Sequence, residues 1–390
     1  WLDNLKIRVS FGSLGNNSTT SYYMYQSLFA TANYILNGNI AGGFAQTILS
    51  NPRLSWEKTY MANAGIGFTF LNRLSGSIDI YDKNTKGILI SLPAPLEHGT
   101  STVPNQNAGE VNNRGFELDL HWNDRIGKVS YSVGFNMGYV NNKVTKFQGD
   151  VSSISGVYKT QEGKPINQLY VMTVDRIVRD EADLDYVKSL VDRNPDYFAT
   201  YQRPELGDFL YADANGDGKL DANDRVEIGH GTQPRLSYGG SIALNWNGLD
   251  FSMLFQGTGN NPVYYNNQAF RFVTVMGQSL NKDITDNAWT PENPYNSKYP
   301  ILRNNSNGKN NIASDAFVHN AAYFRCKNIR LGYTFPAKIT RKFYVENLKL
   351  YTSIDNAFTI TDFPGFDPEI AANVGYPAIR QYSIGLNITF

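Results

Sequence analysis

The chain has 390 residues and carries 35 basic and 35 acidic side chains, so its formal net charge is zero. This balance implies neither nucleic acid nor a polyacidic molecule as a partner. The single cysteine, Cys326, excludes an internal disulfide framework. No stretch approaches the roughly 18 consecutive apolar residues of a membrane helix, but a barrel strand exposes only alternate residues to lipid and needs no such stretch.

Ten segments alternate apolar and polar residues, which is the pattern of strands with one apolar and one wet face. In residues 129–139, every second residue is apolar, and the residues between are serine, glycine or asparagine. Residues 380–390 follow the same pattern and end on Phe390. In chain order, the predicted strands are residues 4–13, 59–71, 73–87, 113–123, 127–142, 236–247, 248–258, 323–335, 346–358 and 380–390.

The connections between the predicted strands alternate strictly between short and long. The short ones lie at 71–73, 123–127, 246–248 and 336–347, and the long ones at about 14–58, 88–112, 143–235, 259–322 and 359–379. Several structureless loops of more than about fifteen residues are uncommon in a compact soluble domain. Short turns at one end and long loops at the other are typical of an outer-membrane barrel.

We therefore predict an all-β fold, a transmembrane antiparallel up-and-down β-barrel with long extracellular loops. The last strand would pair with the first to close such a barrel, and the terminal Phe390 would lie at the lipid–water interface. The alternative is a soluble β-sandwich that ends on a strand. The alternation disfavours it, because the apolar faces are larger than one core would need.

Residues 213–224, with the sequence DANGDGKLDAND, form the clearest local motif. The motif matches the D-x-N-x-D-G pattern of calcium loops, and calcium takes six to eight oxygen ligands. The predicted ligands are the side chains of Asp213, Asn215, Asp217, Asp221 and Asp224 and the carbonyl group of Lys219. The alternative is an acidic, Asx-rich turn without an ion. With calcium, the site would stiffen an exposed loop.

A second candidate site is a group of aromatic residues among amides in residues 259–272. Its members are Tyr264, Tyr265, Phe270 and Phe272. Such side chains stack on sugar rings or line a peptide site. The alternative is that the loop packs against a partner protein. Taking both interpretations together, we predict that these residues contact either a ligand or a partner that acts as a lid.

The sequence shows no catalytic constellation. It has no nucleophile elbow and no phosphate-binding loop. The four histidines, His98, His121, His230 and His319, fall in separate regions of the chain. We therefore predict that the protein is not an enzyme.

Segments at 51–95, 107–122, 207–257, 324–336 and 348–369 resemble, in sequence and in order, the C-terminal part of SusC-like TonB-dependent transporters of the Bacteroidetes. The resemblance implies a barrel of twenty-two strands around an N-terminal plug, with the ten predicted strands as the last ten. Residues 1–390 would then form the C-terminal part of the barrel, with extracellular loop insertions. The main insertions would be about 143–235, which includes the calcium loop, and 259–322.

A ten-stranded sheet alone would leave two unpaired edges in lipid, where unsatisfied backbone groups are costly. We therefore expect the remaining barrel half and the plug on the same chain or on another one, with the N-terminal half cleaved off or outside this sequence. The resemblance implies three further partners: a SusD-like surface lipoprotein as a lid, the TonB–ExbB–ExbD complex reached through the missing N-terminal half, and outer-membrane lipid.

The function implied by the resemblance is active, TonB-dependent uptake of oligosaccharides or peptides across the bacterial outer membrane. The alternative is an accessory, structural barrel subunit of a larger outer-membrane assembly without transport. Import of a siderophore or vitamin by a receptor without a lid is a third interpretation. The calcium loop and the ordered SusC-like segments disfavour it.

Overall fold

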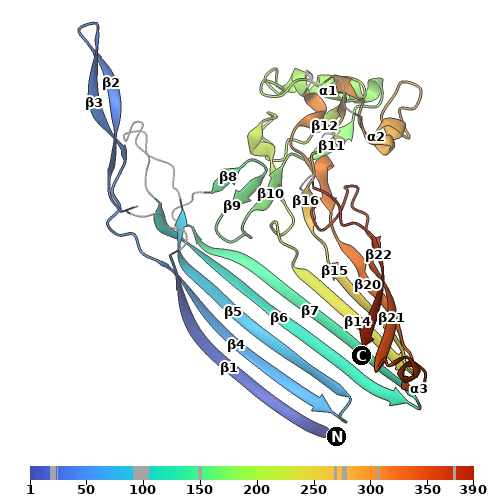
Figure 1. Ribbon diagram of the computed structural model, residues 1–390. Helices are drawn as coiled ribbons and strands as arrows, with labels where there is room; N and C mark the ends of the chain where they lie inside the picture. The colour runs from blue at the N-terminus through green and yellow to red at the C-terminus, as the bar shows by residue number, and fades with distance from the viewer. Residues whose placement is uncertain are drawn as a thin grey trace. The chain divides into compact units, whose positions relative to one another are not determined.

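The computed structural model describes residues 1–17, 23, 25–90, 105–147, 152–267, 270–274, 279–304, 308–371 and 375–390. The chain divides into two compact units. The first contains residues 1–124, 134–153 and 160–166, and the second contains residues 125–133, 154–159 and 167–390. Antiparallel strands dominate both units (Figure 1).

Ten strands make up the large sheet, in the order β1-β4-β5-β6-β7-β14-β15-β20-β21-β22. Their bounds are β1 Leu2–Asn16, β4 Glu57–Phe70, β5 Leu74–Ile90, β6 Gln106–Ile126, β7 Val129–Phe147, β14 Leu236–Trp246, β15 Leu249–Thr258, β20 Tyr323–Thr334, β21 Asn347–Ile360 and β22 Gln381–Thr389. These are the ten strands that the alternation predicted. Their up-and-down order is confirmed, and several extend a few residues beyond the predicted ends.

A tight turn joins β14 to β15. Asn247 and Gly248 have φ values of 46° and 86°, and Asn-Gly is the preferred pair for a two-residue hairpin turn of this kind. A Cβ atom on Gly248 would lie 2.5 Å from the carbonyl oxygen of Thr334. This position therefore requires glycine for its backbone angle and for space.

The apolar faces of the strands are open in each unit. In the first unit, Ile7, Val9 and Phe11 on β1 are 70 %, 80 % and 77 % exposed. In the second unit, Ile384 on β22 is 82 % exposed and Phe390 is 83 % exposed. A soluble monomer rarely exposes continuous apolar stripes of this extent, whereas the wall of a membrane barrel presents them to lipid.

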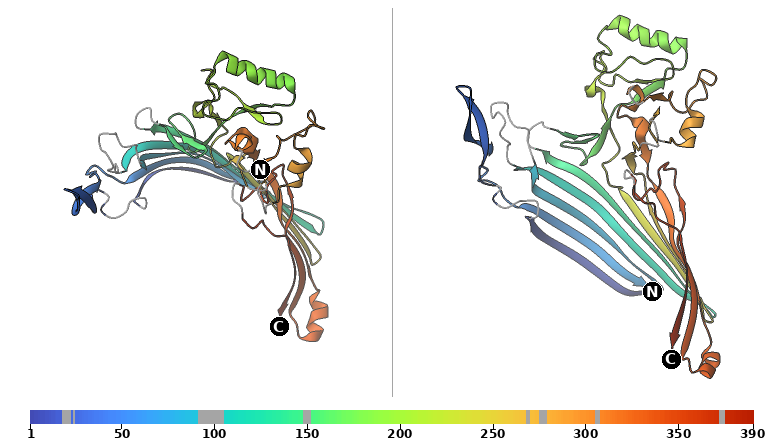
Figure 2. Two further views of the ribbon diagram at one scale, coloured as in Figure 1. Left: turned by 90° about the horizontal axis from the view of Figure 1, so that it is seen from above. Right: turned by 45° about the horizontal axis from the view of Figure 1, so that its top comes forward.

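The main hydrophobic core lies in the second unit, in the long connections between strands. Helix α1 (Glu181–Arg193) contributes the buried side chains of Val187 and Leu190, and Asp180 caps its N-terminus by accepting a hydrogen bond from the Asp183 N–H. Figure 2 shows α1 beyond the ends of the yellow strands of the same unit. Among the described residues, no helix is long and apolar enough to cross a membrane.

The connections contain further short strands and helical elements, which the alternation of apolar and polar residues did not predict. Their strands are β8 Ser153–Ser155, β9 Tyr158–Thr160, β10 Gln168–Val171, β11 Val174–Ile177, β12 Phe209–Tyr211, β13 Val226–Ile228, β16 Pro262–Tyr264, β17 Val273–Thr274, β18 Arg303–Asn304 and β19 Val318–Asn320. The helical elements are α2 Lys282–Asn287, α3 Ala337–Thr340, η2 Ala222–Asp224, η4 Lys309–Asn311, η5 Asp315–Phe317 and η6 Arg341–Phe343.

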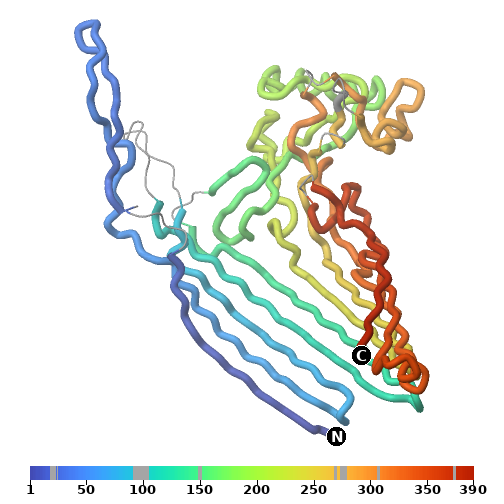
Figure 3. Tube along the Cα trace, in the orientation of Figure 1, coloured from blue at the N-terminus to red at the C-terminus, as the bar shows by residue number. Residues whose placement is uncertain are grey.

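The first long connection, about 14–58, contains an antiparallel hairpin of β2 (Leu28–Leu36) and β3 (Asn39–Ile48). Asn37 and Gly38 form its turn, both with positive φ. Figure 3 shows this hairpin, in blue, extending beyond the ends of the other strands of the first unit. The Asn-Gly pair was the sequence signal for it.

Candidate functional site

The predicted calcium loop folds around its own carboxylates. The two oxygens of Asp213 accept hydrogen bonds from the N–H groups of Gly216, at 2.7 Å, and Gly218, at 2.9 Å. Both glycines have positive φ, at 74° and 79°. An aspartate that binds backbone N–H groups ahead of it stabilises a turn of this type. The loop is therefore tightly folded from its first residue.

The far end of the loop is fixed by Asp224, which is fully buried. Its carboxylate accepts hydrogen bonds from the N–H groups of Ala214, at 3.0 Å, and Asp221, at 2.8 Å. Burial raises the pKa of Asp224 above its usual value, although these backbone hydrogen bonds lower it. A cation near this carboxylate would offset the cost of burying its charge.

The middle of the loop supplies two more polar side chains. Oδ1 of Asn215 accepts from the Asp217 N–H, and Oδ1 of Asp217 accepts from the Lys219 N–H, each at 2.9 Å. These oxygens are hard ligands of the type calcium takes, and an oxygen that accepts one N–H retains a second lone pair. In the described part of the chain, no three His, Cys, Asp or Glu side chains are gathered closely enough to hold a metal ion. Calcium binding here remains a prediction.

The predicted aromatic site lies mostly in the core. Tyr265, Phe270 and Phe272 are almost fully buried and belong to the main hydrophobic cluster, and Tyr264 packs against it. The ring centroid of Phe272 lies 5.0 Å from that of Phe317. Three of these four side chains therefore hold the loops of the second unit together. Tyr264, which is half-buried, retains surface for the predicted ligand or lid contact.

The histidines are not gathered in the part of the chain that the structure describes. His98 lies outside the described residues. Nε2 of His121 lies 3.0 Å from a carboxylate oxygen of Asp119, and Nε2 of His230 lies 2.8 Å from the backbone carbonyl oxygen of Asn260, in a different connection. Burial lowers the pKa of His319, which lies on β19.

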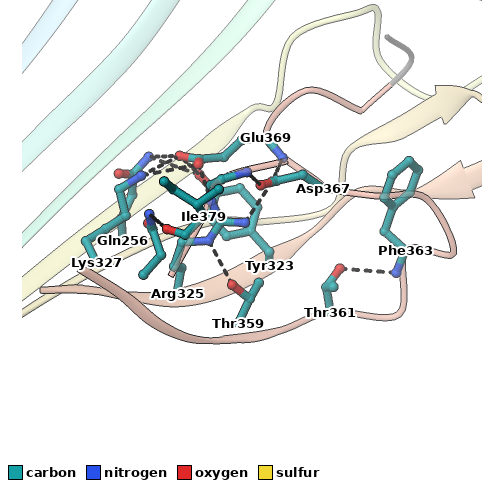
Figure 4. Close-up of polar contacts among 12 residues, drawn as sticks. Gln256, Tyr323, Arg325, Lys327, Thr359, Thr361, Phe363, Asp367, Glu369 and Ile379 are labelled. Atoms are coloured by element: carbon teal, nitrogen blue, oxygen red, sulfur yellow. Dashed lines mark hydrogen bonds and ion pairs between the residues drawn. The ribbon is translucent and has the colours of Figure 1, made fainter. Parts of the chain in front are cut away.

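An ion network on β20 is a feature that the sequence did not predict. Arg325 is 3 % exposed, and its Nη2 lies 2.7 Å from Oδ1 of Asp367, which is 4 % exposed. Nε of Arg325 donates to the Thr359 hydroxyl at 2.8 Å, and Nη1 binds the carboxylate of Glu369 (Figure 4). This network joins β20 and β21 to the connection between β21 and β22.

Several donors of this network bind the carboxylate of Glu369. Its Oε1 accepts hydrogen bonds from the Tyr323 hydroxyl at 3.1 Å, Gln256 Nε2 at 3.2 Å and Lys327 Nζ at 3.1 Å. The close-up shows these donors converging on one carboxylate (Figure 4). With Arg325 on Oε2, both oxygens of Glu369 are engaged.

A cavity of about 470 Å³ opens beside Glu369 in the second unit. Its lining residues are Tyr158, Thr232, Gln233, Pro234, Gln256, Thr258, Asn261, Pro262, Val263, Tyr323, Pro368, Glu369, Ile370 and Ala371. The sequence did not indicate this cavity, because its walls come from five separate parts of the chain.

Curated proteins that match this chain over its whole length are TonB-dependent receptors. No protein-family model matches the chain. TonB-dependent receptor P39 of Formosa agariphila is 29 % identical over 431 aligned positions, which cover 100 % of this chain and 41 % of the relative. TonB-dependent receptor SusC of Bacteroides thetaiotaomicron is 27 % identical, covering 100 % of this chain and 38 % of the relative.

The fold is also similar to a solved structure. The RagAB peptide transporter matches with a TM-score of 0.78 and 26 % sequence identity, over 100 % of this chain and 41 % of that chain. This chain thus spans about two fifths of the length of its relatives. The relatives are receptors and a transporter, in agreement with the prediction that the chain is not an enzyme. The chain is therefore similar, over its whole length, to part of the transmembrane β-barrel of SusC-like TonB-dependent receptors of the outer membrane, as the sequence resemblance indicated.

Proposed function

We propose that the protein containing this chain takes up oligosaccharides or peptides across the outer membrane by TonB-dependent transport. The observation that carries the proposal is the ten-stranded sheet with open apolar faces, which matches a transporter structure along the full chain. The similarity to TonB-dependent receptors supports TonB as the source of energy for this uptake. The similarity to a peptide transporter supports peptides as one substrate class.

We further propose that a SusD-like surface lipoprotein covers the barrel, and that the remaining barrel strands and a plug complete the working unit. The long connections of the second unit, with their own buried core, are suited to present a shaped surface to such a lid. A native mass spectrum of the complex purified from its host tests this. We expect one barrel, complete with plug, together with one lipoprotein.

Transport is tested by uptake of fluorescent oligosaccharides and peptides into cells with and without TonB. We expect accumulation of at least one probe class, lost when TonB is deleted and restored by complementation. Surface binding without TonB-dependent accumulation would contradict transport. It would favour the second candidate, an accessory barrel subunit of a larger outer-membrane assembly.

We also propose that residues 213–224 bind calcium, as a structural ion that stiffens the loop. The proposal rests on the oxygen-rich D-x-N-x-D-G spacing and on the burial of Asp224. Limited proteolysis of the purified protein, with calcium or with a chelator, tests it. We expect the chelator to speed cleavage near Asp217 and to leave the barrel intact. An unchanged cleavage rate would count against calcium.

A further inference from the structure

We propose that the connection between β20 and β21, residues 335–346, binds anionic phospholipid headgroups at the membrane surface. The inference goes beyond transport, since it concerns how the barrel is anchored and holds for any transported substrate. β20 ends at Thr334 and β21 begins at Asn347, so the connection has twelve residues. Two residues suffice to join β14 to β15 at the same end of the sheet, where the Thr334 N–H donates to the Gly248 carbonyl at 2.7 Å. Most of the connection is therefore not needed to reverse the chain (Figure 1).

The connection carries three basic side chains that nothing in the described chain neutralises. Lys338, Arg341 and Lys342 are exposed, and none of them has an ion-pair partner among the described residues. The first acidic residue after Phe335 is Glu346, the last residue of the connection. Three cations this close repel one another, and an anionic surface offsets that repulsion. A leaflet that contains anionic lipid attracts basic residues at this density.

The same twelve residues expose three large apolar side chains. Ile339, Phe343 and Tyr344 are 52 %, 72 % and 91 % exposed. They alternate with the basic residues on a folded segment, since Thr340 is buried and its carbonyl oxygen accepts a hydrogen bond from the Val345 N–H at 3.2 Å. Apolar and basic side chains exposed together on a short segment are the combination that binds a membrane interface.

Tyr344 has a backbone conformation that glycine adopts more easily. Its φ and ψ are 60° and 28°, in the left-handed region, at the C-terminal end of η6. A tyrosine in this region strains the backbone. Because its side chain is almost fully exposed, packing within the described part of the protein does not offset the strain. The headgroup layer of a membrane offsets it, because tyrosine is favoured at the lipid–water interface.

The connection also continues the surface that the strands of this unit present to lipid. β14, β20 and β22 run in the same direction, because each neighbouring pair from β14 to β22 in the sheet is antiparallel. Their last residues therefore lie at one end of the sheet. Trp246 and Tyr333 lie there on one face, since both are paired with Leu249, and both are exposed. Exposed tryptophan and tyrosine at strand ends mark the boundary between hydrocarbon and headgroups, so residues 335–346 begin at headgroup level.

The test uses the full-length protein in nanodiscs of phosphatidylcholine with a minority of phosphatidylglycerol. A fluorophore is attached to a cysteine at Ala337, an exposed residue of the connection, in a background without other cysteines. Bromine atoms on one lipid or on the other quench the fluorophore. The ratio of the two quenching efficiencies, per brominated lipid, measures the local enrichment of anionic lipid. We expect enrichment at low salt that high salt removes.

Two double variants test the role of the charges. Arg341→Gln with Lys342→Gln should lower the enrichment about fivefold for each charge removed. Lys188→Gln with Arg203→Gln is the matched control, because it removes one lysine and one arginine that are also exposed and without an ion pair in the described chain, but lie in a long connection. The control should keep the enrichment. Equal quenching by the two lipids in the unmodified protein, or an equal fall in both double variants, would overturn the proposal.

Tyr344→Gly separates anchoring from folding. Glycine relieves the backbone strain, so the denaturant midpoint in detergent should be equal or higher. Quenching by both lipids should fall, because the connection loses an interfacial ring. Unchanged quenching together with a lower midpoint would show that Tyr344 serves the fold and would contradict its role as an anchor.

A photo-reactive phenylalanine analogue at position 344, activated in intact cells, distinguishes lipid from a protein occupant. We expect phospholipid adducts, identified by mass spectrometry of the purified protein. Adducts with another protein, without lipid adducts, would overturn the proposal.

Discussion

Nη2 of Arg325 lies 2.7 Å from Oδ1 of Asp367, and both side chains are almost completely buried. The two residues are 42 positions apart in the sequence. The same carboxylate also accepts hydrogen bonds from the backbone N–H groups of Glu369 and Ala378, each at 2.9 Å. One aspartate thus fixes two points of the β21–β22 connection to the Arg325 guanidinium on β20.

Replacing this aspartate should loosen the connection. Asp367→Asn leaves the Arg325 charge buried with a weaker partner, and breaking a buried pair costs about 3–5 kcal/mol. We expect faster hydrogen exchange in residues 361–371, measured by mass spectrometry on the full-length protein. Asp362→Asn, an exposed neighbour, is the control. Equal exchange in the two variants would show that the ion pair does not hold the connection.

The same carboxylate predicts a pH dependence. Burial raises the pKa of Asp367, but hydrogen bonds from Arg325 and from the backbone outweigh burial and leave the pKa below its usual value. A lowered pKa in the folded state adds stability above the usual aspartate pKa, and this is lost as the pH falls through the folded-state value. We expect exchange protection of the connection to be constant from neutral pH to about pH 5 and to fall only in stronger acid. Loss of protection between pH 7 and pH 5 would contradict a lowered pKa for Asp367.

Asp224 predicts the opposite behaviour when no calcium is present. Burial raises its pKa, so the protonated form is favoured in the folded loop, and the loop is most stable in acid and loses stability as the pH rises through the folded-state value. Hydrogen exchange of residues 213–224, measured on the full-length protein, tests this. In chelator, we expect protection of the loop to be greatest in acid and to fall toward neutral pH, and we expect calcium to restore it at neutral pH because the ion offsets the buried charge. Protection at neutral pH that calcium leaves unchanged would refute the calcium assignment.

Gly248→Ala should destabilise the β14–β15 hairpin. The residue has φ of 86°, and an added Cβ would lie 2.5 Å from the Thr334 carbonyl oxygen. We expect a loss of about 1–2 kcal/mol in the free energy of unfolding from the backbone angle alone, with more from the clash. Gly12→Ala is the matched control, since a Cβ there meets nothing within 4 Å. Denaturant unfolding in detergent compares the two, and equal midpoints would contradict the expectation.

The strands were predictable because the pattern of apolar and polar residues in each one reflects the surroundings of its two faces. Alternation in residues 380–390 reflects one lipid-facing and one wet face, and it needs no knowledge of distant contacts. The connections were less predictable, since their order comes from contacts between remote segments. Phe272 looks like a binding aromatic in a polar loop, yet it stacks on Phe317 in the core. Arg325 and Asp367 show the same limit, because nothing local indicates that the two charges meet.

Lipid contact along β1, measured residue by residue, decides whether these strands form a barrel wall. Single cysteines at Ile7, Arg8, Val9 and Ser10 in a Cys326→Ala background would carry a fluorophore, and quencher lipids would report contact with the bilayer core. We expect strong quenching at residues 7 and 9 and weak quenching at 8 and 10, because side chains alternate between the two faces of a strand. Uniformly weak quenching at all four positions would show that this strand does not face hydrocarbon, and the barrel-wall assignment would be wrong.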